Sequence, residues 1–214
     1  MENYKQKFIS LSLEIGALKF GEFQLKSGRI SPYFFNMGLF SSGPLIKNIG
    51  DFYAAALVSS NINYDIVFGP AYKGIPIVTA LASSLSTSYQ LDKPFVYNRK
   101  EIKNHGEGGV TVGEELRGNV VIVDDVITAG TAIREAVDII NNAGATTTGI
   151  VISLDRQERG VGDLSAAKEI SNTLNIPVIS IVNLDEVIDY IDNNPSDYSQ
   201  HIDKIKKYRE EYGA

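Results

Sequence analysis

Short, continuously apolar segments that alternate with helix-like stretches constrain the fold of this chain more than any other feature. Residues 119–124, NVVIVD, are the clearest case, because no polar residue interrupts their apolar run. Such runs are typical of parallel strands that are covered on both faces. We expect further strands at 65–69, 94–98, 147–154 and 178–182, and helices at 45–60, 74–86, 131–143 and 163–174. This order predicts an α/β fold with a doubly wound, mainly parallel sheet flanked by helices.

The two ends of the chain are expected to form smaller elements outside this sheet. The helical spacing of apolar residues predicts an N-terminal helix over residues 3–20. Residues 22–43 contain several glycines and a proline around the aromatic cluster at 33–35, which predicts a hood or edge hairpin. Apolar residues after Pro195 recur at the spacing of a surface helix. A length of 214 residues predicts a single domain, with residues 1–43 contributing the N-terminal helix and hood.

Charge and residue usage exclude several classes of protein. The chain has 20 Lys and Arg against 26 Asp and Glu, a net charge of −6, so it has no basic field to attract nucleic acid. It has no cysteine, which excludes disulfide scaffolds, thiolate zinc sites and cysteine nucleophiles. No apolar run has the length of a signal-peptide core or a membrane span. We therefore expect a cytoplasmic protein that binds neither nucleic acid nor a membrane.

The segment after the strand at 119–124 carries the strongest functional pattern. Asp124 and Asp125 stand side by side where the strand ends, which is costly unless cations or hydroxyl donors satisfy both carboxylates. Residues 128–131, TAGT, then lead into a helix, where backbone N–H groups and hydroxyls can hold a phosphate. For these four residues taken alone, a tight turn with a threonine N-cap is the alternative. Together with the paired carboxylates, they predict a site for one monophosphate and a polyhydroxylated sugar.

A second segment follows the predicted strand at 65–69. Residues 69–74, GPAYKG, form a special loop that carries Lys73 toward the edge of the sheet, although a single lysine is more often a solvated surface residue. The loop is not the P-loop of a nucleotide triphosphatase, because Ile75 follows Gly74 where that motif has lysine.

A third segment, residues 98–109, NRKEIKNHGEGG, gathers basic groups in an otherwise acidic chain. We expect residues 99–113 to form a polar loop, and a solvated charge run is the plain interpretation of it. Its place between two strands of the sheet predicts instead a cationic lid.

Residues 120–132, VVIVDDVITAGTA, resemble the thirteen-residue signature of the phosphoribosyltransferase family. The resemblance extends, in order and spacing, to segments 26–36, 71–74, 99–109 and 155–159, and is strongest to the members of the family that use orotate. It implies transfer of a 5-phosphoribosyl group from phosphoribosyl diphosphate to orotate, giving orotidine 5′-monophosphate and diphosphate in pyrimidine synthesis. It further implies Mg²⁺ as cofactor and a homodimer in which lid residues are shared between subunits.

The resemblance also implies roles for individual residues. Those implied to bind phosphoribosyl diphosphate are Lys26, Tyr72, Lys73, Arg99, Lys100, Lys103, His105, Asp124, Asp125, Val126, Ile127, Thr128, Ala129, Gly130, Thr131 and Ala132. Those implied to bind orotate are Lys26, Phe34, Phe35, Thr128 and Arg156. Those implied to act in catalysis are Lys73, Lys103, His105, Asp124 and Asp125. Mg²⁺ is expected to reach the site with phosphoribosyl diphosphate and water near the two aspartates, without an assigned direct ligand from the protein.

Some of these residues have plainer interpretations. Phe34 and Phe35 would pack in the hood like most aromatic residues, and Arg156 would form a surface ion pair with a neighbour such as Glu158. A regulator that kept the fold but binds nucleic acid is an alternative function, although it would need a basic face or an added domain. A family member that uses a purine or uracil is another. His201 receives no role.

Overall fold

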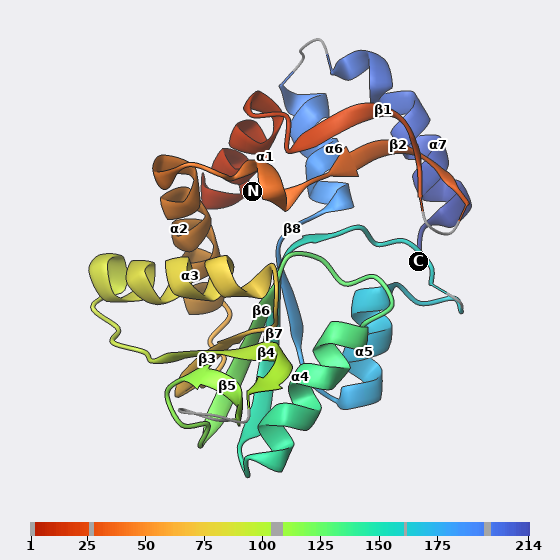
Figure 1. Ribbon diagram of the computed structural model, residues 1–214. Coiled ribbons are helices and arrows are strands. Elements are labelled where there is room, and N and C mark those ends of the chain that lie inside the picture. The colour runs from red at the N-terminus through yellow and green to blue at the C-terminus, as the bar shows by residue number, and fades with distance from the viewer. Residues whose placement is uncertain (1–2, 26–27, 104–108, 161, 195–197) are drawn as a thin grey trace.

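The computed structural model describes residues 3–25, 28–103, 109–160, 162–194 and 198–214, and only the backbone of residues 102 and 103. The strands in these ranges are β1 (Leu18–Gln24), β2 (Ile30–Phe35), β3 (Ile66–Gly69), β4 (Phe95–Lys103), β5 (Gly109–Gly113), β6 (Asn119–Asp124), β7 (Thr146–Asp155) and β8 (Val178–Asn183). The α-helices are α1 (Asn3–Glu14), α2 (Gly43–Ser59), α3 (Gly74–Tyr89), α4 (Thr131–Asn142), α5 (Ala166–Leu174), α6 (Leu184–Asn193) and α7 (Ile202–Tyr212). Figure 1 shows their arrangement around the central sheet.

The central sheet has six strands in the order β5-β4-β3-β6-β7-β8. All neighbouring pairs from β4 to β8 are parallel, and only β5 is antiparallel to its neighbour. The chain passes from β3 to β4 on one side and then returns to place β6 on the other side of β3. The predicted doubly wound, mainly parallel sheet is therefore confirmed.

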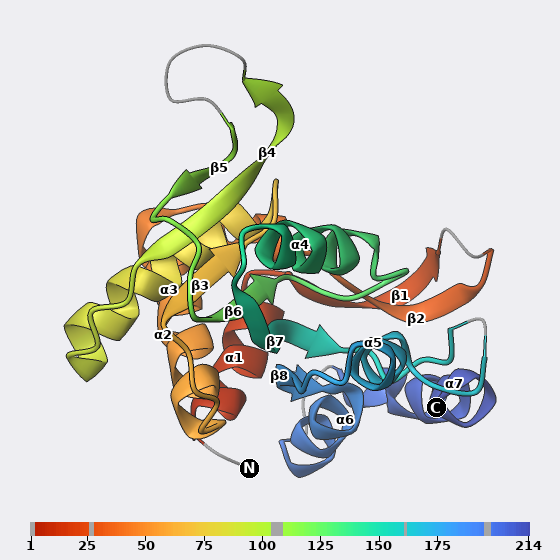
Figure 2. The ribbon, with the colours of Figure 1, turned by 90° about the horizontal axis from the view of Figure 1, so that it is seen from below.

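The two faces of this sheet are covered by different helices. Helices α2 and α3 lie over one face and α4 and α5 over the other (Figures 1 and 2). The residues of β6 alternate between two cores: Val121 and Val123 belong to the first, Val120 and Ile122 to the second. Because both sets are buried, the strand has to be apolar throughout, which is the pattern that predicted it.

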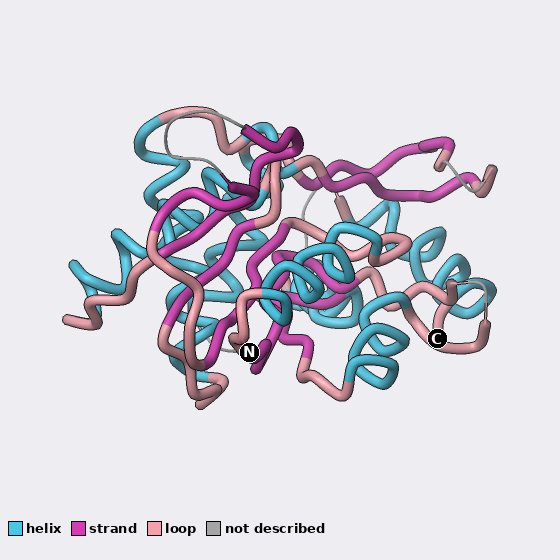
Figure 3. The backbone as a smooth tube through the Cα atoms, turned by 60° about the horizontal axis from the view of Figure 1, so that its bottom comes forward, coloured by secondary structure: helices cyan, strands magenta, loops and turns pink. Residues whose placement is uncertain are grey.

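The hood is a separate antiparallel pair of strands, β1 and β2, with Leu18 opposite Phe35. Figure 3 shows this pair extending away from the central sheet. The predicted hairpin is confirmed, but the predicted helix over 3–20 is too long: α1 ends at Glu14, and the chain turns at Gly16, whose φ is +69°. A residue in the left-handed region ends a helix, so Leu18 and Phe20 belong to β1 instead.

Two further expectations were wrong. The segment expected as a loop at 99–113 is largely the β4–β5 hairpin, in which Asn98 lies opposite Thr111. An edge hairpin can be polar because solvent covers it, so its composition resembles that of a loop. Helix α5 begins at Ala166 and not at residue 163, because Ser165 caps it by accepting a hydrogen bond from the Lys168 amide.

The C-terminal part of the chain contains one predicted helix and one that was missed. The surface helix expected after Pro195 is α7, whose Ile205 and Tyr208 are buried. Helix α6 was not predicted, although a capping box of Asn183 and Glu186 marks its start. Among the described residues, no helix combines the length and apolar character that crossing a membrane requires.

Candidate active site

The candidate site lies where β3 and β6 end side by side. Connections leave these two strands in opposite directions along the sheet, and ligands of open α/β sheets bind at such a switch point. The loop after β3 carries Tyr72 and Lys73, and the loop after β6 carries the paired aspartates. The fold thus brings together two segments that the sequence separates by about fifty residues.

The loop after β3 is held tightly at its base. A Cβ atom on Gly69 would lie 2.2 Å from the Gly74 carbonyl oxygen, so the two ends of the loop come into direct contact. The Ala71 amide donates to the buried Asn98 side chain at 2.7 Å, and the Ala71–Tyr72 peptide bond is cis. Tyr72 projects into solvent with 73% of its surface exposed. Sequence reasoning gave no role to Asn98, whose amide fixes this loop from β4.

We use the name carboxylate loop for residues 124–132. Both Asp124 and Asp125 are buried at its start, and Asp125 forms an ion pair with Lys73. The Asp124 carbonyl accepts from Tyr53 at 2.8 Å, and the Asp125 carbonyl accepts from the Ser153 amide at 2.9 Å. The backbone of the two aspartates is therefore anchored to α2 and β7.

Asp124 has an unusual proton affinity. Burial, followed by the neighbouring charge of Asp125, raises its pKa from 3.8 to about 7, while the Asp125 amide and Lys73 act to lower it. In the amide contact, Asp124 Oδ1 accepts from the Asp125 N–H at 2.9 Å, an ordinary hydrogen-bond length. Near neutral pH this carboxyl is poised between accepting and donating hydrogen bonds.

The rest of the carboxylate loop opens toward solvent before α4. Thr128, Ala129 and Thr131 are exposed, and the cap of α4 is Gly130, with φ of +73°, and not a threonine. A Cβ atom on Gly130 would lie 2.5 Å from the end of the Ile170 side chain, so a larger residue would have to displace that side chain as well as adopt an unfavourable backbone conformation. The first hydrogen bond of the helix runs from the Arg134 amide to the Gly130 carbonyl. The earlier amides at the helix start are oriented to receive an anion.

The basic residues of β4 border the same edge. Arg99 donates to the Gly109 carbonyl at 3.3 Å across the hairpin, and Lys100 lies 3.3 Å from Glu135 of α4. The proposed roles of Lys26, His105 and the Lys103 side chain lie outside the described residues.

Arg156 lies at the end of β7, the strand next to β6. It forms an ion pair of 2.5 Å with Glu158, donates to the Ser31 hydroxyl at 3.2 Å, and places its guanidinium 4.3 Å from the centre of the Tyr33 ring. Tyr33 also donates to Glu158 at 2.8 Å. We call these four residues the arginine corner. The Arg156 and Glu158 side chains are 17% and 12% exposed, so the surface ion pair offered as the plainer interpretation is a partly buried pair that joins the hood to the sheet.

The charge of Arg156 is secure in this corner. Burial lowers its pKa, but Tyr33 and Glu158 more than offset that influence and the pKa is raised overall. Burial raises the pKa of the Tyr33 hydroxyl well above its ordinary value, so it remains a hydrogen-bond donor. Sequence reasoning missed Ser31 and Tyr33, because nothing in their local pattern reveals contacts with residues 125 positions away.

The two phenylalanines of the hood have different surroundings. Phe34 is 41% exposed and stacks on Phe23 with a centroid distance of 5.5 Å. Phe35 packs against the buried Phe8 of α1 at 6.0 Å. Hood packing therefore accounts for Phe35, while Phe34 presents an open aromatic face.

Comparisons with known proteins agree with this geometry. A family model described as a phosphoribosyl transferase domain matches residues 40–185. The chain is 53% identical over 214 residues to an orotate phosphoribosyltransferase of Mannheimia succiniciproducens and 54% identical to one of Marinobacter nauticus, with both chains covered in full. The fold is similar to that of the crystal structure of orotate phosphoribosyltransferase from Francisella tularensis, with a TM-score of 0.88 and 44% identity over 97% of this chain and all of that one.

Proposed function

The chain belongs to the phosphoribosyltransferase family, and from this premise we propose that it transfers the 5-phosphoribosyl group from phosphoribosyl diphosphate to orotate. The products are orotidine 5′-monophosphate and diphosphate, and the reaction is a step of pyrimidine nucleotide synthesis. The observation that carries this proposal is full-length similarity to proteins that bear this name.

The carboxylate loop is suited to the ribose 5-phosphate half of the donor. The exposed residues Thr128, Ala129 and Thr131 at the start of α4 offer backbone N–H groups and hydroxyls to the phosphate. Asp124 and Asp125 lie next to this cradle, where their carboxyl groups would bind the ribose hydroxyls. A pKa near 7 lets Asp124 accept or donate such a hydrogen bond.

The loop after β3 and the basic residues of β4 are suited to the diphosphate. Lys73 pairs with Asp125 but keeps 59% of its side chain exposed, so it can reach a ligand without losing that partner. We assign Tyr72, Lys73, Arg99, Lys100, Lys103 and His105 to this half of the site. In the reaction the bond from the anomeric carbon to diphosphate breaks, a bond to an orotate ring nitrogen forms, and the proton of that nitrogen passes to the departing diphosphate or to solvent. Cations stabilise the negative charge that collects on the departing diphosphate.

The arginine corner is suited to orotate. Its planar, permanently charged guanidinium matches a planar carboxylate or ring oxygen. The exposed ring of Phe34, together with Lys26, Phe35 and Thr128, completes the set that we assign to this substrate. Uracil lacks the carboxylate, so a site built around that anion leaves a buried cationic donor without its partner when uracil binds.

Phosphoribosyltransferases generally use Mg²⁺ with phosphoribosyl diphosphate. Asp124 and Asp125 provide two adjacent carboxylates at this site, and no group of three or more metal-binding side chains occurs among the described residues. This donor set fits a magnesium ion bound mainly by phosphate oxygens and water and supported by one or two carboxylates. When bound, the ion neutralises charge on the diphosphate.

We further infer a homodimer in which the lid formed by residues 99–109 serves the site of the neighbouring subunit. The projection of the β4–β5 hairpin beyond the central sheet supports this inference (Figure 2). We assign the reaction to the cytoplasm, because both substrates are charged metabolites.

The proposed function is tested by the ultraviolet absorbance of orotate, which falls as orotate is converted to its nucleotide. Purified protein with phosphoribosyl diphosphate and Mg²⁺ should consume orotate and release one diphosphate for each molecule consumed. Uracil in place of orotate should be used on the order of 10⁴-fold less efficiently. Equal use of both bases, or no consumption of orotate, would refute the proposal.

A further inference from the structure

The turn that carries Arg156 is held from outside the site by residues that have no assigned role. Gln157 is its central residue and has a φ of +51°, in the left-handed region. Its amide donates to Asp155 Oδ1 at 2.9 Å, which fixes the start of the turn. Arg156 and Glu158 flank Gln157, and both belong to the arginine corner. The direction of Arg156 therefore depends on how Gln157 is held.

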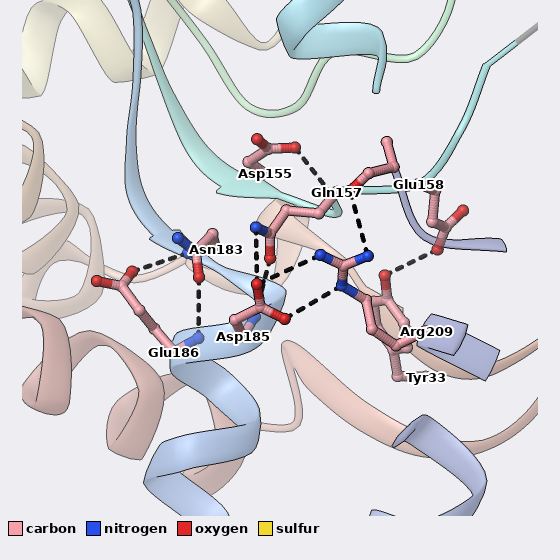
Figure 4. A network of polar contacts seen from close by, with 9 residues as sticks. Tyr33, Asp155, Gln157, Glu158, Asn183, Asp185, Glu186 and Arg209 are labelled. Atoms are coloured by element: carbon pink, nitrogen blue, oxygen red, sulfur yellow. Dashed lines mark hydrogen bonds and ion pairs between the residues drawn. The ribbon is translucent and has the colours of Figure 1, made fainter. Parts of the chain in front are cut away.

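The Gln157 side chain is bound at both ends by a single residue, Asp185 of α6 (Figure 4). Its Nε2 donates to Asp185 Oδ2 at 3.0 Å, and its Oε1 accepts from the Asp185 backbone amide at 2.9 Å. A reversed amide would place donor against donor and acceptor against acceptor, so only one orientation satisfies both contacts.

Arg209 of α7 holds Asp185 in place. Its Nε lies 3.1 Å from Asp185 Oδ1 and its Nη2 lies 3.3 Å from Oδ2, a two-point contact between the two residues (Figure 4). Such a pair, with 52% of the Asp185 side chain exposed, contributes little to global stability. The pair instead acts locally, because the Asp185 carboxylate that it orients also accepts the hydrogen bond from Gln157.

The end of the chain continues this support. The Ala214 amide donates to the Gln157 carbonyl at 2.9 Å, and the Arg159 amide donates to the Tyr212 carbonyl at 2.8 Å. Glu158 and Gly213 form an antiparallel bridge. The last residue of α7 and the two residues that follow it are thus connected to every residue of the turn from Gln157 to Arg159.

We propose that Asp185 and Arg209 are positioning residues of the orotate site, which act by fixing Gln157 and thereby the direction of Arg156. This inference rests on the proposed function. It adds that α6 and α7 support the part of the site that binds orotate. Neither residue needs to touch the substrate. Their loss should therefore affect orotate binding and leave the phosphoribosyl diphosphate half of the site intact.

The chain offers a matched control. Asp192, also on α6, accepts from Lys206 of α7 at 2.7 Å, with an exposure of 43% that is close to that of Asp185. It has no hydrogen bond with the turn among the described residues. Asp185→Ala and Asp192→Ala therefore each remove an ion pair between the same two helices, but only the first also removes a contact with Gln157. The Asp185 backbone amide remains in this variant and can still donate to Gln157 Oε1.

The experiment measures KM for each substrate, kcat and the melting temperature for both variants. Asp185→Ala should raise the KM for orotate about 10-fold, as expected for losing a charge-assisted contact, with KM for phosphoribosyl diphosphate and kcat within about twofold of wild type. Asp192→Ala should leave all three constants within about twofold. If Asp185→Ala matches its control, or raises both KM values together with a loss of melting temperature, the proposal is wrong.

A second variant covers the case in which Asp185→Ala does not fold. Gln157→Asn keeps an amide and tolerates the left-handed backbone, but it is one methylene too short to reach Asp185. It loses both contacts with Asp185, so it should raise the KM for orotate at least as much as Asp185→Ala does. The double variant should be no worse than Gln157→Asn alone, because both changes break one coupling. Additive effects would overturn the proposal. Orotate use by the wild type is scored separately, so failure of the proposed function is distinguishable from failure of this inference.

Discussion

The carboxylate loop and the arginine corner lie at the ends of neighbouring strands, with Asp124 of β6 paired to Ile152 of β7, but the chain builds them differently. The carboxylate loop is nine consecutive residues between a buried strand and a helix. The arginine corner joins residues 31 and 33 of the hood to residues 156 and 158.

This difference predicts how each region fails. The fold of the carboxylate loop is fixed by the core on both sides of the sheet, so a polar substitution there should change chemistry without disturbing the hood. The arginine corner holds the hood itself through partly buried charges. A substitution there should change both orotate binding and local stability.

The largest effect is expected at the paired aspartates. Asp124→Asn and Asp125→Asn should each lower kcat/KM for phosphoribosyl diphosphate, because each removes a preorganised charged group. The expected loss of transition-state stabilisation is about 2 to 4 kcal/mol. Steady-state kinetics measures this loss. Asp138→Asn, on the exposed face of α4, is the control and should retain wild-type kinetics. Wild-type values in both aspartate variants would remove the carboxylate loop from the donor site.

The next effect concerns the lid. Lys103→Ala should lower kcat at least ~10²-fold and largely spare the KM for orotate, because its charge is needed as diphosphate departs. Single-turnover and steady-state rates measure the change.

The same variant tests the shared lid. Mixing inactive Lys103→Ala and Asp125→Asn proteins should restore activity, because a hybrid dimer would contain one intact composite site. If the mixture remains as inactive as its components after subunit exchange, each subunit works with its own lid.

A smaller effect is expected at the arginine corner. Arg156→Ala should raise the KM for orotate roughly 10- to 100-fold and reduce the preference over uracil, because a charge-assisted contact is lost. It should also lower the melting temperature, since the partly buried Glu158 is left without its cation. Kinetics with both bases and thermal melting measure these changes.

Arg156→Lys separates the two consequences. It keeps a charge beside Glu158 but loses the planar two-point geometry. We expect it to restore the melting temperature more fully than the KM for orotate. An unchanged ratio of orotate to uracil use in Arg156→Ala would remove Arg156 from the base site and leave it a structural role only.

The sequence revealed the carboxylate loop because its chemistry is contiguous. Nine consecutive residues contain the end of an apolar strand, two aspartates and the small residues before a helix. This pattern is enough to predict both where the site lies and what kind of ligand it binds. The same local information predicted Lys73, since it follows the neighbouring strand. No local pattern links Ser31 or Tyr33 to Arg156, and none shows Asn98 holding the loop after β3.

The elements of the fold also divide into those with a clear local pattern, which were predicted, and those without one, which were not. Strands buried on both faces, such as β6 and β7, were predicted within about a residue because continuous apolar runs define them. The β4–β5 hairpin was mistaken for a loop, since exposed edge strands need no apolar pattern. The end of α1 was misplaced because Leu18 and Phe20 continue its spacing while Gly16 ends the helix.

The smallest effect concerns the stability of the carboxylate loop and depends on pH. Asp124 has a pKa of about 7 in the folded protein, but it is ionised near pH 4 and above in the unfolded chain. From about pH 6 to about pH 8 the folded state therefore releases a proton that the unfolded state has already lost, and stability falls as pH rises. For one such group the loss is about 1.4 kcal/mol, and Asp124→Asn should abolish it.

Denaturant unfolding of wild type and variant across this pH range, without substrate or metal, measures how the free energy of unfolding changes with pH in each protein. Asp138→Asn should retain the wild-type slope. Parallel slopes for wild type and Asp124→Asn would show that Asp124 is already ionised below pH 6, in which case its carboxylate can only accept hydrogen bonds from the ribose.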